Sequence, residues 1–257
     1  PTKRMQIVTS HSFLIEHRTL AAFDIETSLD PAAAAAAGYK GSGMPAALQK
    51  ISTACLLVAS ENAQGDWGDV RLRTLAGPQS EFEILMSLDE ELEALASCGA
   101  VLTTYNGRAH DLAVLRRRAA RYWMFGLPGL TAAMTMDHLD VMLRQRLGRR
   151  DRTPSLRQAC AAMGISAFES RRTTGRVIEP AVAKCQIDVV ATFLLALYEL
   201  SMERGCPDPL LKGWGALSDY LTAICPRAEH LEHFRNHTLL LAAQRAQGPA
   251  FPGLKAN

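Results

Sequence analysis

Cysteine is scarce in this sequence and never forms a C-x-x-C pair. The 257 residues contain six cysteines, scattered along the chain, and several of them stand within apolar runs. Cysteine in such positions behaves as a small hydrophobe, and a zinc or disulfide framework is not indicated. We therefore expect reduced, buried thiols, as is typical of a cytoplasmic protein.

Long apolar runs are also missing. No run approaches the roughly 18 uninterrupted apolar residues of a membrane helix, so we expect no membrane partner. The opening stretch PTKRMQIVTSHSF has a basic start but lacks the long apolar region of a signal peptide. With 48% hydrophobic and 21% charged residues, the composition indicates a globular chain of one large domain, or of one domain with an appendage.

Lysine is absent from the middle of the chain, where arginine supplies all the positive charge. Residues 101–180 carry 14 arginines against 6 acidic residues, whereas residues 1–100 carry 7 basic against 13 acidic residues. The planar guanidinium group binds two phosphate oxygens at once. The basic middle region therefore favours a polyanionic partner, although a solvated arginine surface fits the composition equally well.

The pattern of apolar residues predicts a mixed α/β fold. Strands are expected over 18–27, 51–60, 70–76, 100–106 and 135–139, and the third of them alternates as an edge strand does. Helices are expected over 80–97, 110–123, 139–147, 155–164 and 181–204, followed by two or three short helices from residue 207. Three consecutive strands followed by alternating helices and strands indicate a mixed sheet with helices on its faces.

Two carboxylates stand at the end of the first predicted strand. Asp24 and Glu26 are separated by one residue, and residues i and i+2 of a strand point to the same face. Two carboxylates on a largely buried strand repel each other and are costly to remove from water. A divalent cation resolves both problems, because it supplies positive charge and accepts oxygen ligands.

Two further acidic residues occupy notable positions. Asp111 follows a predicted strand and an Asn-Gly turn at the start of a helix, where it is either a functional carboxylate or a helix cap. Asp188 lies within the apolar helix segment CQIDVVATFLLAL, where a charged group needs a partner or a metal ion. A buried arginine is the alternative partner for Asp188.

Three segments together resemble a known family. FDIET (23–27), YNGRAHDLAVLRRRA (105–119) and CQIDVVATFLLALYEL (185–200) resemble the three motifs of DEDD-type 3′–5′ exonucleases. The nearest branch is that of the predicted 3′–5′ exonucleases related to the proofreading domain of family B DNA polymerases. The resemblance covers residues 18–203. It implies a ribonuclease-H-like domain over residues 1–204, with residues 205–257 as a helical C-terminal extension.

The resemblance also implies an activity and a set of site residues. Asp24, Glu26, Asp111 and Asp188 would hold two Mg²⁺ or Mn²⁺ ions, in a phosphodiesterase that acts on single-stranded 3′ ends of DNA or RNA. Hard oxygen ligands suit these ions. The residues that it places at the nucleic acid are Thr27, Asn106, Gly107, Arg108 and His110. The run Arg116–Arg118 would either meet phosphates or be solvated.

The third motif departs from the family pattern. The family carries a tyrosine four residues before the last aspartate, or a histidine five residues before it, and this chain has Lys184 and Ala183 there. Lys184 is open to three interpretations: a general base with a lowered pKa, a point charge that orients water or phosphate, or the mark of a weakened enzyme that mainly binds nucleic acid. His110 replaces a usual phenylalanine and is a second candidate for the missing base.

Histidines cluster near the C-terminus. His230, His233 and His237 are spaced i, i+3 and i+7, so a helix would place them on one face. Such a face either binds zinc or forms a solvated surface stripe.

Overall fold

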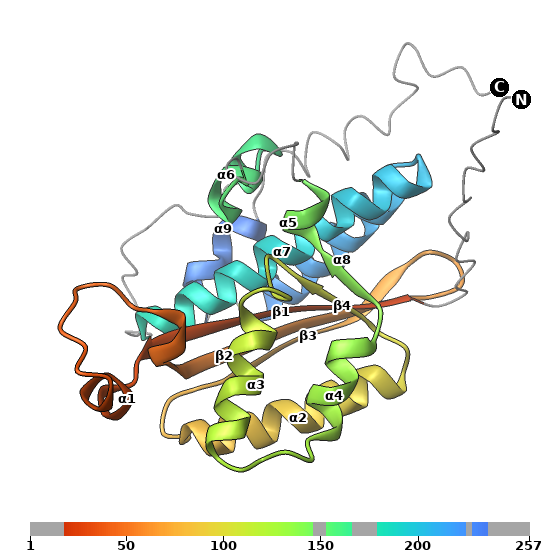
Figure 1. Ribbon diagram of the computed structural model, residues 1–257. Coiled ribbons are helices and arrows are strands. Elements are labelled where there is room, and N and C mark those ends of the chain that lie inside the picture. Colours follow the sequence, from red (N-terminus) through yellow and green to blue (C-terminus); the bar gives the residue numbers. More distant parts are fainter. Residues whose placement is uncertain (1–17, 146–152, 166–178, 225–227, 236–257) are drawn as a thin grey trace, which may run out of the picture.

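The computed structural model describes residues 18–145, 153–165, 179–224 and 228–235 (Figure 1). Its strands are β1 Arg18–Leu29, β2 Gln49–Glu61, β3 Trp67–Leu75, β4 Val101–Thr104 and β5 His138–Asp140. Its α-helices are α1 Pro31–Ala36, α2 Glu81–Ser97, α3 Asp111–Arg121, α4 Pro128–Thr135, α5 Val141–Arg144, α6 Leu156–Ala162, α7 Pro180–Arg204, α8 Asp208–Ile224 and α9 Glu232–Arg235. Two 3₁₀ helices, η1 Ala46–Leu48 and η3 Glu229–Leu231, complete the described part.

The strands form one mixed sheet in the order β3-β2-β1-β4-β5. β1, β2 and β3 are antiparallel neighbours, and β4 is parallel to both β1 and β5. The prediction of a mixed α/β sheet flanked by helices, followed by C-terminal helices, is confirmed, and β3 lies at the expected edge. β3 starts earlier than the predicted residue 70, because Trp67 already pairs with Glu61 of β2.

Helices cover both faces of the sheet (Figure 1). Alternate β1 residues divide between two cores: Leu20 and Ala22 pack with α7 and α8, while Ala21 and Phe23 pack with α2 and α3. The helices α2, α3 and α4 therefore occupy one face, and α5 to α9 occupy the other. Asp24 and Glu26 share the parity of Leu20, so the strand periodicity directs them toward the face of α7.

Local sequence signals explain some helix starts, and tertiary contacts explain others. α2 begins after a capping box formed by Ser80 and Glu83, a local pattern that favours a helix start and agrees with the helix predicted over 80–97. α4 was not predicted, because it is short and its position depends on α2. The Leu130 amide of α4 donates to Asp89 Oδ1 of α2 at 2.7 Å, and Gly129 lies directly against the Asp89 carbonyl.

The long helix α7 lies against the sheet and α8 (Figure 1). Among the described residues, it alone is long and apolar enough to cross a membrane by length and composition, although 61% of its apolar window is buried inside the protein. A core helix meets the same criteria. α7 ends where Gly205 adopts a left-handed conformation with φ of 64°, as is common for glycine after a helix.

The C-terminal helices share a core with the sheet. α8 is a single 17-residue helix, where shorter helices were predicted. Trp214 of α8 is buried, and its Nε1 donates to the Phe234 carbonyl at 3.0 Å. The Leu72 amide of β3 donates to the Tyr220 hydroxyl of α8 at 3.0 Å. These contacts attach the C-terminal region to the edge strand.

The cysteine prediction is correct in part. All five cysteines of the described segments are free, and Cys55, Cys160 and Cys185 are buried. Cys98 is exposed and Cys206 is partly exposed, so the expectation of burial is wrong for Cys98. Cys98 is exposed because it follows the last turn of α2, where the buried apolar face of the helix ends.

Candidate metal centre

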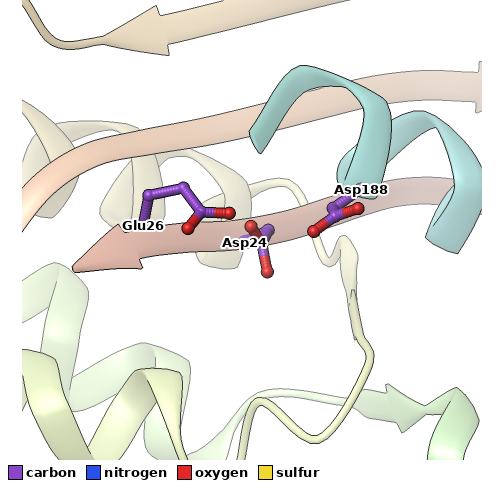
Figure 2. A group of neighbouring side chains, drawn as sticks. All are labelled: Asp24, Glu26 and Asp188. Carbon is purple, nitrogen blue, oxygen red and sulfur yellow. The ribbon is translucent and has the colours of Figure 1, made fainter. Parts of the chain in front are cut away.

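β1 presents Asp24 and Glu26 side by side. Asp24 pairs with Cys55 and Glu26 with Thr53 of β2, and the register shifts immediately after Glu26. The two side chains point to the same side of the strand (Figure 2), as the period of two requires. The Cys185 thiol of α7 donates to the Asp24 carbonyl at 3.4 Å, which joins the helix to the strand at this point.

Asp188 completes a cluster of three carboxylates from distant segments. It projects from α7 toward Asp24, which lies between Asp188 and Glu26 (Figure 2). One oxygen from each of the three residues lies within 4.8 Å of the others. Within the described ranges, no other group of three histidine, cysteine or acidic side chains meets this distance. The structure thus brings together three of the four predicted ligands.

Several carboxylate oxygens of the cluster are buried without a hydrogen-bond partner. In the described part of the chain they are Asp24 Oδ2, Asp188 Oδ1 and Asp111 Oδ2. Burial raises the pKa of Asp24 well above its usual value, and the charges of Asp111 and Asp188 raise it further. Buried carboxylates that repel one another are unfavourable, and a divalent cation would satisfy both the charge and the unpartnered oxygens.

Asp111 lies beside the cluster. It is 4% exposed, and its charge raises the pKa of Asp24. β1 and β4 are parallel neighbours, so their C-terminal ends lie at the same edge of the sheet. Because α3 follows β4 in the chain, its first residues lie near Asp24. Asp111 is not the cap of α3: the cap position is His110, whose Nδ1 lies 2.8 Å from Asp111 Oδ1. That hydrogen bond raises the pKa of His110.

Lys184 reaches into the cluster from one turn before Asp188. Its Nζ lies 2.9 Å from Asp188 Oδ2 and also contacts Glu26 Oε1. Burial by itself lowers the pKa of Lys184, but the Asp188 charge and the hydrogen bonds to both carboxylates outweigh it, so the pKa is raised. Asp188 is therefore paired with a lysine, not with the buried arginine considered from the sequence.

The Asn-Gly turn positions the start of α3. Asn106 has a left-handed φ of 70°, and its backbone N–H donates to Asp140 Oδ1 at 2.9 Å. The Gly107 amide donates to Thr104 Oγ1 at 3.1 Å. A Cβ at residue 107 would lie 2.5 Å from the Thr104 side chain, so the close approach requires glycine. The Asn-Gly turn therefore has a structural role at the start of α3, independent of any contact with nucleic acid.

Two residues near the cluster were not predicted as site residues. Asp140 is 6% exposed, and its charge contributes to the raised pKa of Asp111. His138 lies 2.7 Å from Thr104 Oγ1 and accepts from Arg108 Nε at 3.0 Å. Burial lowers the pKa of His138 to about 4, so it is neutral at pH 7. The position of Asp140 directly after the predicted strand 135–139 was the signal in the sequence that could have found it.

The arginine run of α3 divides into different environments. Arg118 is 4% exposed and binds Asp30 and Glu81, so it is unavailable to phosphate. Arg117 donates to the Ala46 carbonyl, and Arg116 is exposed.

Other predicted nucleic-acid residues differ in exposure. Arg108 is exposed, whereas Thr27 and His110 are only partly exposed. Half of the arginines counted over residues 101–180 lie outside the described residues.

The C-terminal histidines do not form a zinc site within the described residues. His230 in η3 hydrogen-bonds to Gln186 Oε1 of α7 at 2.7 Å, and His233 in α9 packs on the Phe234 ring. Both are partly buried, which also corrects the expectation of a solvated stripe. His237 lies outside the described residues.

Comparison of the chain with protein-family models and with curated proteins finds no match. The chemistry of the site is therefore argued from its own geometry. An all-carboxylate donor set from β1 and α7, with buried unpartnered oxygens, suits a hard divalent cation such as Mg²⁺ or Mn²⁺.

Proposed function

We propose that the chain is a metal-dependent 3′–5′ exonuclease with a ribonuclease-H-like fold, which hydrolyses phosphodiester bonds at single-stranded ends of DNA or RNA. The observation that carries the proposal is the convergence of Asp24, Glu26 and Asp188 within 4.8 Å. The motif resemblance predicts these residues as ligands, although Asp188 is far from Asp24 and Glu26 in the sequence. The mixed five-stranded sheet with helices on both faces is compatible with the proposed fold.

The carboxylates would hold the Mg²⁺ or Mn²⁺ ions, two of them in the mechanism that the resemblance implies. Bound cations of this kind lower the pKa of a coordinated water and stabilise charge on a leaving 3′ oxygen. Asp111 would complete the ligand set, because it is buried beside the cluster and its Oδ2 is unpartnered. Asp140 would support this region, since it holds the Asn106 turn.

Lys184 would act as a point charge in this enzyme. A general base needs a lone pair, and a lysine that contacts two carboxylates is held in its protonated form. The geometry therefore favours orientation of water or phosphate over proton abstraction. His110 is better placed than Lys184 to exchange a proton, since its Nδ1 lies against Asp111 and it is partly exposed.

A nucleic-acid-binding module with little or no turnover is the alternative function. The specific observation in its favour is Lys184, which stands where the family has tyrosine and which is already paired with two predicted metal ligands. Both functions predict a bound cation and a bound nucleic acid, so only turnover separates them.

The test compares hydrolysis with binding for matched variants. Labelled single-stranded DNA and RNA are incubated with Mg²⁺, Mn²⁺ or EDTA and with wild type, Asp24→Asn or Asp219→Asn. Asp219 is an exposed acid on α8, remote from the cluster in sequence and element, and serves as the control. We expect Asp24→Asn to lower nucleotide release by at least about 100-fold, as for loss of a positioned catalytic group, and Asp219→Asn to retain it.

Binding of the same oligonucleotides is measured by fluorescence anisotropy. Retained binding with no release by wild type in either metal would overturn the enzyme proposal and leave the binding module. A circular single strand tests the third possibility, a ribonuclease-H-like endonuclease, because an exonuclease leaves a molecule without ends intact.

A further inference from the structure

The ammonium group of Lys184 already contacts two of the carboxylate oxygens that a pair of metal ions would use. Its ammonium group contacts Glu26 Oε1 and lies 2.9 Å from Asp188 Oδ2. These two acids are members of the three-carboxylate cluster, one from β1 and one from α7. The ammonium thus sits where a cation that bridges the two residues would sit.

Three other carboxylate oxygens, in the cluster and on Asp111 beside it, make no contact with Lys184. Asp188 Oδ1, Asp24 Oδ2 and Asp111 Oδ2 are buried and have no hydrogen-bond partner within the described residues. Asp188 is 7% exposed and Asp111 is 4% exposed. Unpartnered buried carboxylate oxygens of this kind indicate a ligand that the side chains lack. Asp188 therefore faces Lys184 with one oxygen and leaves the other free.

We propose that Lys184 is a resident cation of the carboxylate cluster, which takes the place of a second divalent ion, so that the wild-type chain binds one ion firmly and a second only in competition with Lys184. The first ion is assigned to the free oxygens of Asp24 and Asp188, both members of the cluster, with Asp111 as the neighbouring buried carboxylate. The inference rests on the proposed function only in that the cluster binds divalent cations, and it does not require hydrolysis.

Charge balance supports this division. Four ionised carboxylates are neutralised by two divalent ions when the residue at position 184 is uncharged. With the lysine ammonium present and His110 neutral, one divalent ion leaves a single negative charge, whereas two ions leave an excess positive charge. Like charges in contact are unfavourable, so the ammonium and a second ion disfavour each other.

The exposure of Lys184 makes this a competition and not a permanent block. Its side chain is 59% exposed, compared with 16% for Glu26 and 10% for Asp188. A long, exposed side chain can move into water at modest cost. A second ion can therefore enter at high concentration, and the measurable effect is a weakened second affinity.

The experiment counts Mn²⁺ ions bound to the full chain by calorimetry, with electron paramagnetic resonance as a second readout. Wild type, Lys184→Gln, Lys184→Arg and Lys212→Gln are compared. Lys212→Gln is the matched control, because Lys212 also forms a lysine–carboxylate ion pair, with Asp66 at 2.7 Å. Circular dichroism checks that each variant is folded.

We expect one firmly bound ion for wild type, Lys184→Arg and Lys212→Gln. For Lys184→Gln we expect two ions, with the second bound at least about tenfold more tightly than in wild type. The resonance spectrum of the Lys184→Gln variant should show magnetic coupling between two neighbouring ions, as expected for metals about 4 Å apart. Retention of the charge in Lys184→Arg separates the effect of charge from that of side-chain removal.

Equal ion counts and affinities in wild type and Lys184→Gln would overturn the inference, as would a second firm site in Lys184→Arg. The proposed exonuclease fails separately: an ion count that changes as expected, with no nucleotide release by wild type, leaves the inference standing. Absence of any bound ion in both wild type and Lys184→Gln would overturn both.

Discussion

Arg118 anchors α3 through a buried ion-pair network, and its removal is expected to destabilise the protein strongly. Its Nε and Nη2 donate to Glu81 at 2.7 and 2.6 Å, and its Nη1 donates to Asp30 at 2.8 Å. The three side chains are only 5 to 8% exposed. Arg118→Met keeps an unbranched apolar stem, but it removes the cation that Glu81 binds and leaves Asp30 with only the exposed Arg121, 3.8 Å away.

The expected loss of stability in Arg118→Met depends on the hydrogen bonds that Asp30 and Glu81 retain. Removal of one partner of a buried ion pair costs about 3–5 kcal/mol. Asp30 keeps its bonds from the Ala32 and Ala33 amides, and Glu81 keeps the Ile51 amide, so we expect the lower end, about 3 kcal/mol. With a denaturant slope of roughly 2–3 kcal/mol per molar urea, the unfolding midpoint should fall by about 1–1.5 M.

Urea unfolding followed by circular dichroism measures this shift. The control is Arg116→Met, an exposed arginine on the same helix, for which we expect a change within about 0.5 kcal/mol. Equal urea midpoints for Arg118→Met and Arg116→Met would show that the buried ion pairs of Arg118 do not stabilise the protein. Addition of Glu81→Gln to Arg118→Met should recover part of the loss, because it removes one of the unpaired buried charges.

The metal cluster and the helix contacts give further predictions. In the absence of metal, Asp24→Asn should raise the free energy of unfolding by at least about 1 kcal/mol at pH 7, and it should abolish the rise in melting temperature that Mn²⁺ gives wild type. Because burial raises the pKa of Asp24 well above 3.8, this gain should be absent near pH 3, grow as the pH rises from 3.8 toward the raised pKa, and stay constant above it. A gain independent of pH would show that the ionised Asp24 carboxylate is not its cause. Gly129→Ala should cost about 1–3 kcal/mol or more, because its Cβ would lie 1.8 Å from the Asp89 carbonyl. Gly126→Ala, with open space around it, should leave the melting temperature nearly unchanged.

The sequence predicted well those elements whose signals are local. β1 and β2 follow from their apolar, β-branched runs, and α2 follows from its capping box. Asp24 and Glu26 share a strand face because the side-chain period is two. These features depend on neighbouring residues alone, so they can be derived without knowledge of the tertiary structure.

Features that depend on contacts between distant segments were missed or left open. α4 is held by α2 across 41 residues of sequence, and no local pattern specifies that contact. Arg118 lies four residues after Val114 and three after Leu115, on the buried face of α3. This spacing was an available signal for burial, but the arginine run suggested a solvated or phosphate-binding surface. The pairing of Lys184 with Glu26 across 158 residues could not be predicted from either segment.

The most direct test of the central claim is the direction and metal dependence of nucleotide release. A single-stranded oligonucleotide labelled at its 5′ end, and the same strand labelled at its 3′ end, are incubated with wild type in Mn²⁺ and in EDTA. A 3′–5′ exonuclease should give a ladder of shortening 5′-labelled products and immediate release of labelled mononucleotide from the 3′ end, both with Mn²⁺ and neither with EDTA. Intact strands in Mn²⁺, or equal cleavage in EDTA, would contradict it.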